Sequence, residues 1–158
     1  MNQKNLFTAL FICGALSFAA CNSESKSDAN SGDSTANNTA STDGTDPKGI
    51  GKFKNVELTH PLDEKMVASG KSIYDVKCQS CHKLTDERVV GPGWKGVTDR
   101  RQPEWIMNFV TNVDEMLEKD TASQKLLETC LVRMPNQNLN DDEARHVLEF
   151  MRKNDGKE

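Results

Sequence analysis

Two thiols and an imidazole stand within five residues of the sequence, in the run Cys78-Gln79-Ser80-Cys81-His82. A C-x-x-C-H run is the attachment signature of a c-type haem. Both thiols can add to the vinyl groups of one haem, and the imidazole of His82 can bind the iron through a ring nitrogen. The two intervening residues let the sulfurs reach both vinyl groups, and the next residue then directs its imidazole to the metal. The run therefore predicts one covalently bound haem c, with His82 as an iron ligand.

A C-x-x-C pair also occurs in two other kinds of site. Thioredoxin-like redox sites need a βαβ pattern, and no strand-like run flanks Cys78. A zinc site needs two more ligands at short spacing, and the remaining candidates, Cys130, His60 and His146, are isolated in the sequence. The haem interpretation is therefore favoured.

A second iron ligand is predicted at Met134, which directly precedes Pro135 in a break between two helical patterns. Proline keeps the preceding residue extended, so a methionine there can point inward without belonging to a helix face. The 52 positions that separate His82 from Met134 leave room for the chain to cross the haem plane. A bis-histidine site through His60 or His146 is the alternative. Four other methionines lie on helical patterns and are interpreted as packing residues: Met66, Met107, Met116 and Met151.

Hydrophobic residues recur every three or four positions through most of the segment 62–158, which predicts an all-α fold. The expected helices begin near Asp63, Pro103, Thr121 and Asn140, the last two with the pattern of a capping box. Gly70 interrupts the first helix and predicts the close approach of another backbone. The inward faces are expected to carry Met66, Gly70, Ile73, Tyr74 and Lys77 in the first helix, Trp105, Ile106, Phe109, Val110 and Val113 in the second, and Ala144, Val147, Leu148 and Met151 in the last.

The first twenty residues predict export from the cytoplasm. An apolar core follows Lys4 and has the length of a signal peptide rather than of a membrane-spanning helix. It ends in Phe18-Ala19-Ala20-Cys21, which resembles a bacterial lipoprotein signal, although Phe18 stands where leucine is usual. Residues 1–20 are therefore predicted to be removed and Cys21 to be lipidated. An ordinary secretory signal with a chance cysteine is the alternative. Export suits the haem, because bacterial c-type attachment takes place outside the cytoplasmic membrane.

Residues 22–46 consist of Ser, Asn, Asp, Thr, Ala and Gly with a few charges, and contain no aromatic or branched aliphatic residue. Such a segment cannot bury enough apolar surface to offset the entropy of ordering it. We assign residues 21–61 to a tether and residues 62–158 to one domain, with Ile50, Phe53, Val56 and Leu58 available to pack on that domain. Treated as a coil, residues 22–61 have a reach of about 35 Å.

Charge separates along the same boundary. The chain has a net charge of −4, and residues 47–158 are nearly balanced, with 18 Lys and Arg against 19 Asp and Glu. This balance gives no basic surface for nucleic acid. A domain of this size has a marginal core, and a covalent haem would stabilise it. Cys130 is expected to be a small buried residue, since the other four cysteines are assigned to the signal, the lipid and the haem.

Several motifs together resemble a class I cytochrome c and follow each other in the order of that family. They are Gly70-x-x-Ile73-Tyr74-x-x-x-Cys78-x-x-Cys81-His82, Gly91-Pro92-Gly93-Trp94-x-Gly96-Val97, Arg133-Met134-Pro135 and a last helix with Phe150. The resemblance covers nearly all of residues 62–154. It implies several helices wrapped round one haem, with Gly70 and Tyr74 packed against Phe150 where the first and last helices cross.

The resemblance also implies roles around the haem. The carbonyl of Pro92 would accept the Nδ1 proton of His82 and fix the ring. Trp94 stands where the family often has leucine and would make the haem wall bulkier. Arg100 stands where a propionate-binding arginine is frequent, with Trp94 or Trp105 as neutral partners. Residues 112–133 form a longer segment than in the mitochondrial form.

Two classes of function are compatible with these motifs. A His/Met haem has no open coordination position and suits a one-electron carrier that is not an enzyme and shows no turnover of its own. A haem enzyme or gas sensor needs a sixth coordination position that can open. A sensor of the cytochrome c′ type would carry its C-x-x-C-H run near the end of the domain, whereas Cys78–His82 lies near the start of residues 62–158. We therefore predict a membrane-anchored, monomeric carrier facing the periplasm, which delivers electrons to a terminal oxidase or nitrogen-oxide reductase. A fixed electron-entry subunit of a larger complex is the alternative.

Overall fold

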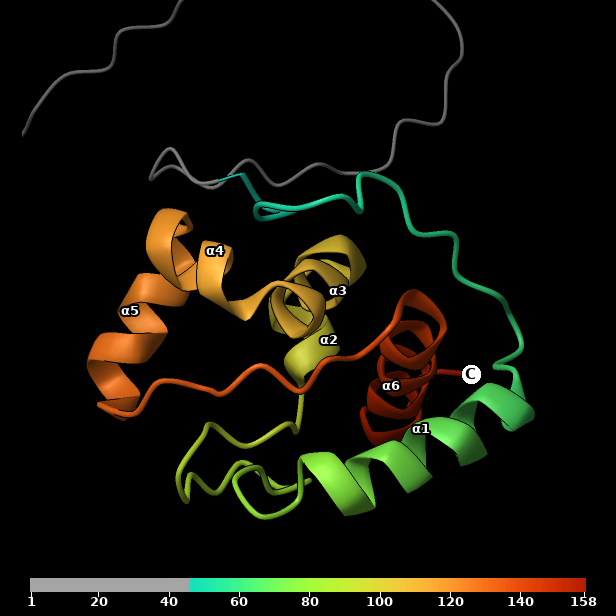
Figure 1. Ribbon diagram of the computed structural model, residues 1–158. Helices are drawn as coiled ribbons and strands as arrows, with labels where there is room; N and C mark the ends of the chain where they lie inside the picture. Colours follow the sequence, from blue (N-terminus) through green and yellow to red (C-terminus); the bar gives the residue numbers. More distant parts are fainter. Residues whose placement is uncertain (1–45) are drawn as a thin grey trace, which may run out of the picture. The chain divides into compact units, whose positions relative to one another are not determined.

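The computed structural model describes residues 46–158, and every regular element in this range is a helix. The helices are α1 (Glu64–Lys77), α2 (Val97–Arg100), α3 (Pro103–Thr111), α4 (Val113–Lys119), α5 (Thr121–Cys130) and α6 (Asp141–Asn154) (Figure 1). The predicted all-α class is confirmed. The predicted signal peptide, the lipidation site Cys21 and the tether up to residue 45 lie outside the described residues.

Helices α1 and α6 cross at close range (Figure 1). A Cβ atom added at Gly70 would lie 2.0 Å from the carbonyl oxygen of His146, so the two backbones meet at a distance that only glycine permits. The rings of Tyr74 and Phe150 pack beside this contact, with centroids 5.5 Å apart. The crossing that the sequence motifs implied is therefore present.

The ends of three helices are held by side chains. Asp63 caps α1 by accepting hydrogen bonds from the backbone of Lys65 and Met66. The capping box predicted for the last helix is confirmed, because the side chains of Asn140 and Glu143 each bind the other residue's backbone N–H. Helix α5 differs from the prediction, because its N-cap is Asp120 rather than Thr121. The carboxylate of Asp120 reaches the Ser123 amide at 2.7 Å, which leaves Thr121 as the first helical residue.

The second predicted helix is interrupted at Asn112. Helix α3 ends at Thr111, and the fully buried Val113 begins α4. Asn112 has a φ of −145°, outside the helical range, so the chain turns before α4 starts. The turn directs α4 and α5 away from α3 (Figure 1), and these two short helices pack on each other.

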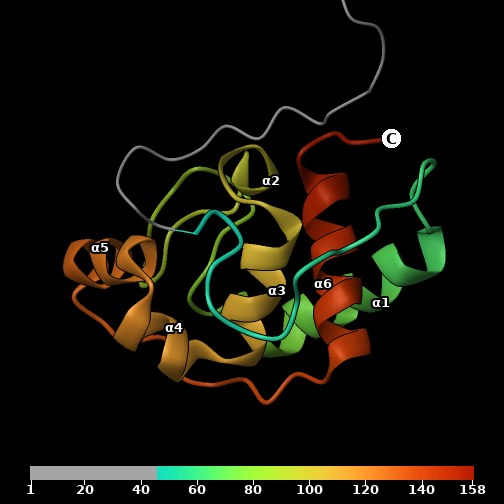
Figure 2. The same cartoon turned by 90° about the horizontal axis from the view of Figure 1, so that it is seen from above.

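Residues 46–61 form an extended segment, here called the N-terminal strap, that packs on the helices. It runs over α3 and continues beside α6 (Figure 2), and Ile50, Phe53 and Val56 pack against the hydrophobic core. The packing that the sequence allowed for Ile50, Phe53 and Val56 is therefore present, and the tether assigned to residues 21–61 does not extend over residues 46–61. The folded unit begins upstream of the predicted boundary at residue 62.

A buried amide holds the strap. The side chain of Asn108, which is fully buried in α3, accepts the Phe53 N–H at 2.9 Å and donates to the carbonyls of Phe53 and Lys48, both at 2.9 Å. Nearby, the Val56 N–H donates to the carboxylate of Glu104 at 3.1 Å. The backbone N–H and C=O groups of the strap have few backbone partners, so side chains of α3 supply the missing hydrogen bonds.

Replacing Asn108 with alanine is expected to lower the free energy of unfolding by about 2–3 kcal/mol, because three partly buried backbone groups lose their partner. Urea denaturation of the haem-loaded protein measures the change. Asn55→Ala is the control, since the exposed Asn55 side chain only accepts a bond from Lys48 at 3.1 Å. An equal loss in both variants would contradict the role of the buried amide.

Within residues 46–158, no helix combines the length and apolar character needed to cross a bilayer.

Candidate haem site

His82 is held in one orientation by its surroundings. Its Nδ1 lies 2.8 Å from the carbonyl oxygen of Pro92. A carbonyl only accepts, so Nδ1 carries the proton and Nε2 keeps its lone pair for a metal. Burial lowers the pKa of His82, and the hydrogen bond to Pro92 opposes that shift without reversing it. The neutral imidazole, which is the form that binds iron, is therefore favoured. The bond predicted between His82 and Pro92 is present.

The chain around His82 folds tightly. The hydroxyl of Tyr74 donates to the His82 carbonyl at 2.8 Å, and the Gly91 N–H donates to the Cys81 carbonyl at 2.9 Å. A Cβ atom added at Gly91 would lie 2.3 Å from Cε1 of His82. Glycine at this position is therefore required by the space that the imidazole occupies.

Cys78 and Cys81 begin this loop and form no disulfide. Burial raises the pKa of the Cys78 thiol to about 11, which is the opposite of the lowered pKa of a redox-active or metal-binding thiolate. Within residues 46–158, no group of three or more His, Cys, Asp or Glu side chains could hold a metal ion. The burial of Cys78 does not favour the thioredoxin-like interpretation, and residues 46–158 offer no further ligands for the zinc interpretation.

A cavity of about 360 Å³ opens beside Cys81 and His82. Its wall is mostly apolar and is contributed by residues that are far apart in the sequence. Helix α3 supplies Trp105, Ile106, Phe109 and Val110, helix α5 supplies Leu126, Leu127 and Cys130, and the segment before α2 supplies Trp94. An apolar cavity with an imidazole and a thiol in its wall fits an iron macrocycle attached through cysteine.

Met134 lies on the wall of the same cavity as His82. It belongs to residues 131–140, which connect α5 to α6 without regular structure and cross the molecule between those helices (Figure 1). Met151 also borders the cavity, but from the buried face of α6. Neither His60 nor His146 belongs to the described wall, since His60 contacts Arg152 and His146 contacts Ser69. The fold thus places His82 and Met134 on the wall of one cavity, whereas the bis-histidine candidates His60 and His146 lie elsewhere.

Comparison with known proteins decides the family, because the family model for cytochrome c matches residues 67–155. This chain belongs to the cytochrome c family. It is an electron-transfer haem protein, and its cofactor is a covalently bound haem c.

Solved structures agree with this assignment. A cytochrome c from Rhodothermus marinus is 30% identical, with a TM-score of 0.67, and the match covers 70% of this chain and 98% of that one. An engineered form of that cytochrome is 29% identical over 71% of this chain and all of that chain, with a TM-score of 0.66. A cytochrome c domain from Pseudomonas putida is 28% identical over 55% of this chain and 88% of that chain, with a TM-score of 0.50. A comparison with curated proteins found no match.

The two tryptophans of this cytochrome c have different partners. Trp94 is buried in the cavity wall, and its ring lies 4.9 Å from that of Tyr74 and 5.7 Å from that of His82. Trp105 also borders the cavity, but its indole N–H donates to the carboxylate of Asp120 at 3.1 Å. This bond uses the single N–H of Trp105, which speaks against Trp105 as the neutral partner of a propionate, and the role of Trp94 stays a prediction.

Arg100 borders the cavity, as predicted for a residue near the haem edge. Its guanidinium donates to the carbonyl of Lys95 at 2.6 Å and lies 3.5 Å from that of Gly93. Arg101 borders the cavity as well, and its guanidinium stacks over Trp105 at 4.5 Å from the ring centroid. The binding of a propionate by Arg100 stays a prediction.

Three features of the site did not emerge from the sequence. Asp120 joins α5 to Trp105, and its position just before Thr121 was the available signal. Cys130 is half-buried on the cavity wall rather than fully buried. Arg88 donates to the Thr129 carbonyl at 2.5 Å and so connects the haem-attachment loop to the end of α5.

Proposed function

We propose that this cytochrome c is a membrane-tethered one-electron carrier of a respiratory chain, with His82 and Met134 as the two iron ligands. The observation that carries the proposal is that both side chains lie on the wall of one apolar cavity. With an imidazole and a thioether bound, no coordination position is left for a substrate. The residues thus support a carrier more than a haem enzyme or a gas sensor.

The bound haem would supply a reversible ferric–ferrous couple, and a thioether ligand favours the ferrous state. The protein's part is to hold this group and control its surroundings. Cys78 and Cys81 would form the two thioether bonds, and the carbonyl of Pro92 keeps the His82 imidazole oriented. The apolar side chains of Trp94, α3 and α5 in the cavity wall would limit the access of water to the iron. Arg100 is our proposed partner for a propionate.

The mouth of the cavity supports docking of a redox partner close to Cys81. Val90 and Val132 border the cavity and are exposed, and Val89 and Leu131 are exposed next to them in sequence. Leu131 is 84% exposed and has a φ of 59°, a backbone conformation that leucine rarely adopts. A bulky apolar side chain held outward at such a position suits contact with another protein rather than packing.

The tether is the second part of the proposal. In it, Cys21 carries the lipid on the periplasmic side, and only residues before the strap can act as a linker. Treated as a coil, residues 22–45 would reach about 27 Å, less than the estimate for the segment up to Pro61. Such confinement gives effective concentrations that reach the millimolar range. Weak docking to a donor and then to a terminal oxidase or nitrogen-oxide reductase would therefore suffice.

Stepwise shortening of residues 23–45, which leaves the strap intact, tests the carrier against a fixed subunit. A carrier should lose its rate of oxidation by native membranes once the linker no longer spans donor and acceptor. The control restores the original length with an unrelated Gly-Ser sequence and should restore the rate. A rate that does not depend on linker length, together with stable co-purification with one oxidase or reductase, would contradict the carrier and favour the fixed subunit.

A further inference from the structure

The segment that carries Met134 has little backbone support. Among the described residues, no backbone–backbone hydrogen bond joins residues 132–139 to another part of the chain. Two bonds lie within the segment, from the Gln137 side chain to the Pro135 carbonyl and from the Asn138 amide to the Asn136 side chain. Leu139 is its one buried residue and lies at the α6 end. The position of Met134 therefore depends on side chains from other elements.

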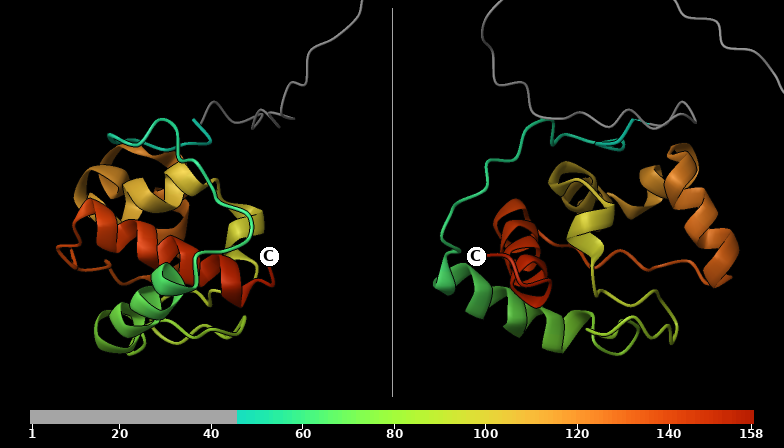
Figure 3. Two further views of the ribbon diagram at one scale, coloured as in Figure 1. Left: turned by 90° about the vertical axis from the view of Figure 1, so that its right-hand side faces the viewer. Right: turned by 180° about the vertical axis from the view of Figure 1, so that it is seen from behind.

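The first such contact comes from the end of α1. The ammonium group of Lys77 donates to the carbonyl of Gln137 at 3.1 Å, in a partly buried position. Lys77 directly precedes Cys78, so this bond connects the haem-attachment segment to the Met134 segment, 60 positions further along the chain. Figure 3 shows the C-terminal end of α1 and the connection from α5 to α6 in one region of the molecule.

The second contact comes from α4. Arg133 donates to the carboxylate of Asp114 at 2.7 Å, and the two side chains are 53% and 69% exposed. Arg133 is the neighbour of Met134, so the contact restrains the segment on the α5 side. Exposed ion pairs contribute little, because water screens them and two long side chains must be ordered. A charged donor on a carbonyl that is partly shielded from water contributes more.

We infer that Lys77 is a positioning residue for the sixth iron ligand, and that its bond to Gln137 limits how often the Met134 segment leaves the iron. The Arg133–Asp114 pair adds a weaker restraint at the other end. This inference rests on the proposed ligation by Met134. An added ligand such as imidazole binds only while Met134 is displaced, so its apparent affinity is its intrinsic affinity multiplied by the open fraction. Loss of the Lys77 bond raises that fraction.

The test is imidazole binding to the ferric haem-loaded protein, followed by absorbance. Lys77→Ala is expected to bind imidazole about tenfold more tightly than the wild type, whereas Asp114→Asn should change the affinity by about twofold or less. Lys71→Ala is the matched control, because Lys71 lies on the same helix and its ion pair, with the exposed carboxylate of Asp75 at 2.6 Å, is remote from the Met134 segment in sequence. Lys77→Arg keeps a charged donor and should remain close to the wild type.

Each outcome has a distinct meaning. Tighter binding in Lys77→Ala but not in Lys71→Ala, with equal urea midpoints for the two, supports positioning rather than general destabilisation. If Lys77→Ala matches Lys71→Ala while Met134→Ala binds imidazole far more tightly than the wild type, the inference about Lys77 is overturned and the ligation stands. If Met134→Ala binds imidazole no more tightly than the wild type, the proposed ligation itself fails.

Discussion

Replacing Met134 with alanine will lower the midpoint potential by on the order of 100 mV and open the ferrous iron to carbon monoxide. The potential falls because a thioether stabilises the ferrous state more than water or hydroxide does. Carbon monoxide binds because alanine leaves no protein ligand at the sixth position. A spectroelectrochemical titration and the absorbance change on adding carbon monoxide to the reduced protein measure the two effects.

Met151 offers the matched control, since it is the other methionine on the cavity wall. It lies on the buried face of α6, so Met151→Leu keeps the volume and should cost less than about 1.5 kcal/mol of stability. Its midpoint potential should stay near that of the wild type, and it should not bind carbon monoxide. If the reduced wild type binds carbon monoxide as readily as Met134→Ala, or if only the Met151 variant loses its ligand, the assignment of Met134 is wrong.

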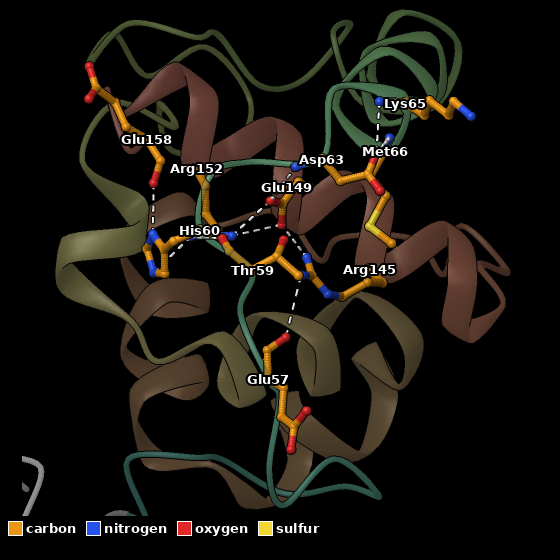
Figure 4. A network of polar contacts seen from close by, with 10 residues as sticks. All are labelled: Glu57, Thr59, His60, Asp63, Lys65, Met66, Arg145, Glu149, Arg152 and Glu158. Atoms are coloured by element: carbon orange, nitrogen blue, oxygen red, sulfur yellow. Dashed lines mark hydrogen bonds and ion pairs between the residues drawn. The ribbon is translucent and has the colours of Figure 1, made fainter.

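The second large effect is a loss of stability on replacing Glu149. This carboxylate is 0% exposed and lies between Arg145 and Arg152 (Figure 4), with both of its oxygens within 2.9 Å of one guanidinium nitrogen of Arg152. The two arginines also donate to the carbonyls of Glu57 and Thr59, so the cluster fastens the strap to α6. Glu149→Gln leaves two buried or half-buried cations without their counter-charge. We expect a loss of about 3–5 kcal/mol in the free energy of unfolding.

This loss should depend on pH in a defined direction. Burial alone would raise the pKa of Glu149, but the hydrogen bonds and charges of Arg145 and Arg152 outweigh it and lower the pKa below its ordinary value of 4.5. A carboxyl group with a lowered pKa in the folded state stabilises the protein above its unfolded-state pKa and loses that contribution in more acid solution. The difference between wild type and Glu149→Gln should therefore be full at pH 7 and shrink below about pH 4.5.

Glu64→Gln serves as the control for this experiment. Glu64 pairs with Lys153 at 3.0 Å, and both side chains are mostly exposed, so the change should cost about 0–1 kcal/mol. Urea unfolding of the haem-loaded proteins across the pH range measures the loss in the free energy of unfolding for both variants. Similar losses of stability in the two variants would contradict a stabilising role for the buried Glu149 cluster. A difference between wild type and Glu149→Gln that grows in acid would contradict it as well.

The sequence by itself determined the parts of this protein that depend on neighbouring residues. The spacing of Cys78, Cys81 and His82 predicted the haem, and the Asn140 capping box and the buried stripe of α6 follow from local pattern. The crossing of α1 and α6 was also predictable, because Gly70 and Tyr74 belong to a motif of the family. In each case the information lies within one element or in a motif of fixed spacing.

Only the tertiary structure decided which distant groups meet. The strap contains apolar residues that could pack on the domain, but its polar partners Glu104, Asn108 and Arg152 lie on α3 and α6. Trp105 carries one N–H, and its bond to Asp120 joins α3 to the start of α5 across the turn at Asn112. The bond from Lys77 to Gln137 likewise joins elements 60 positions apart. A side chain's partner is set by the path of the backbone in space, and the pattern of residues around it does not contain that path.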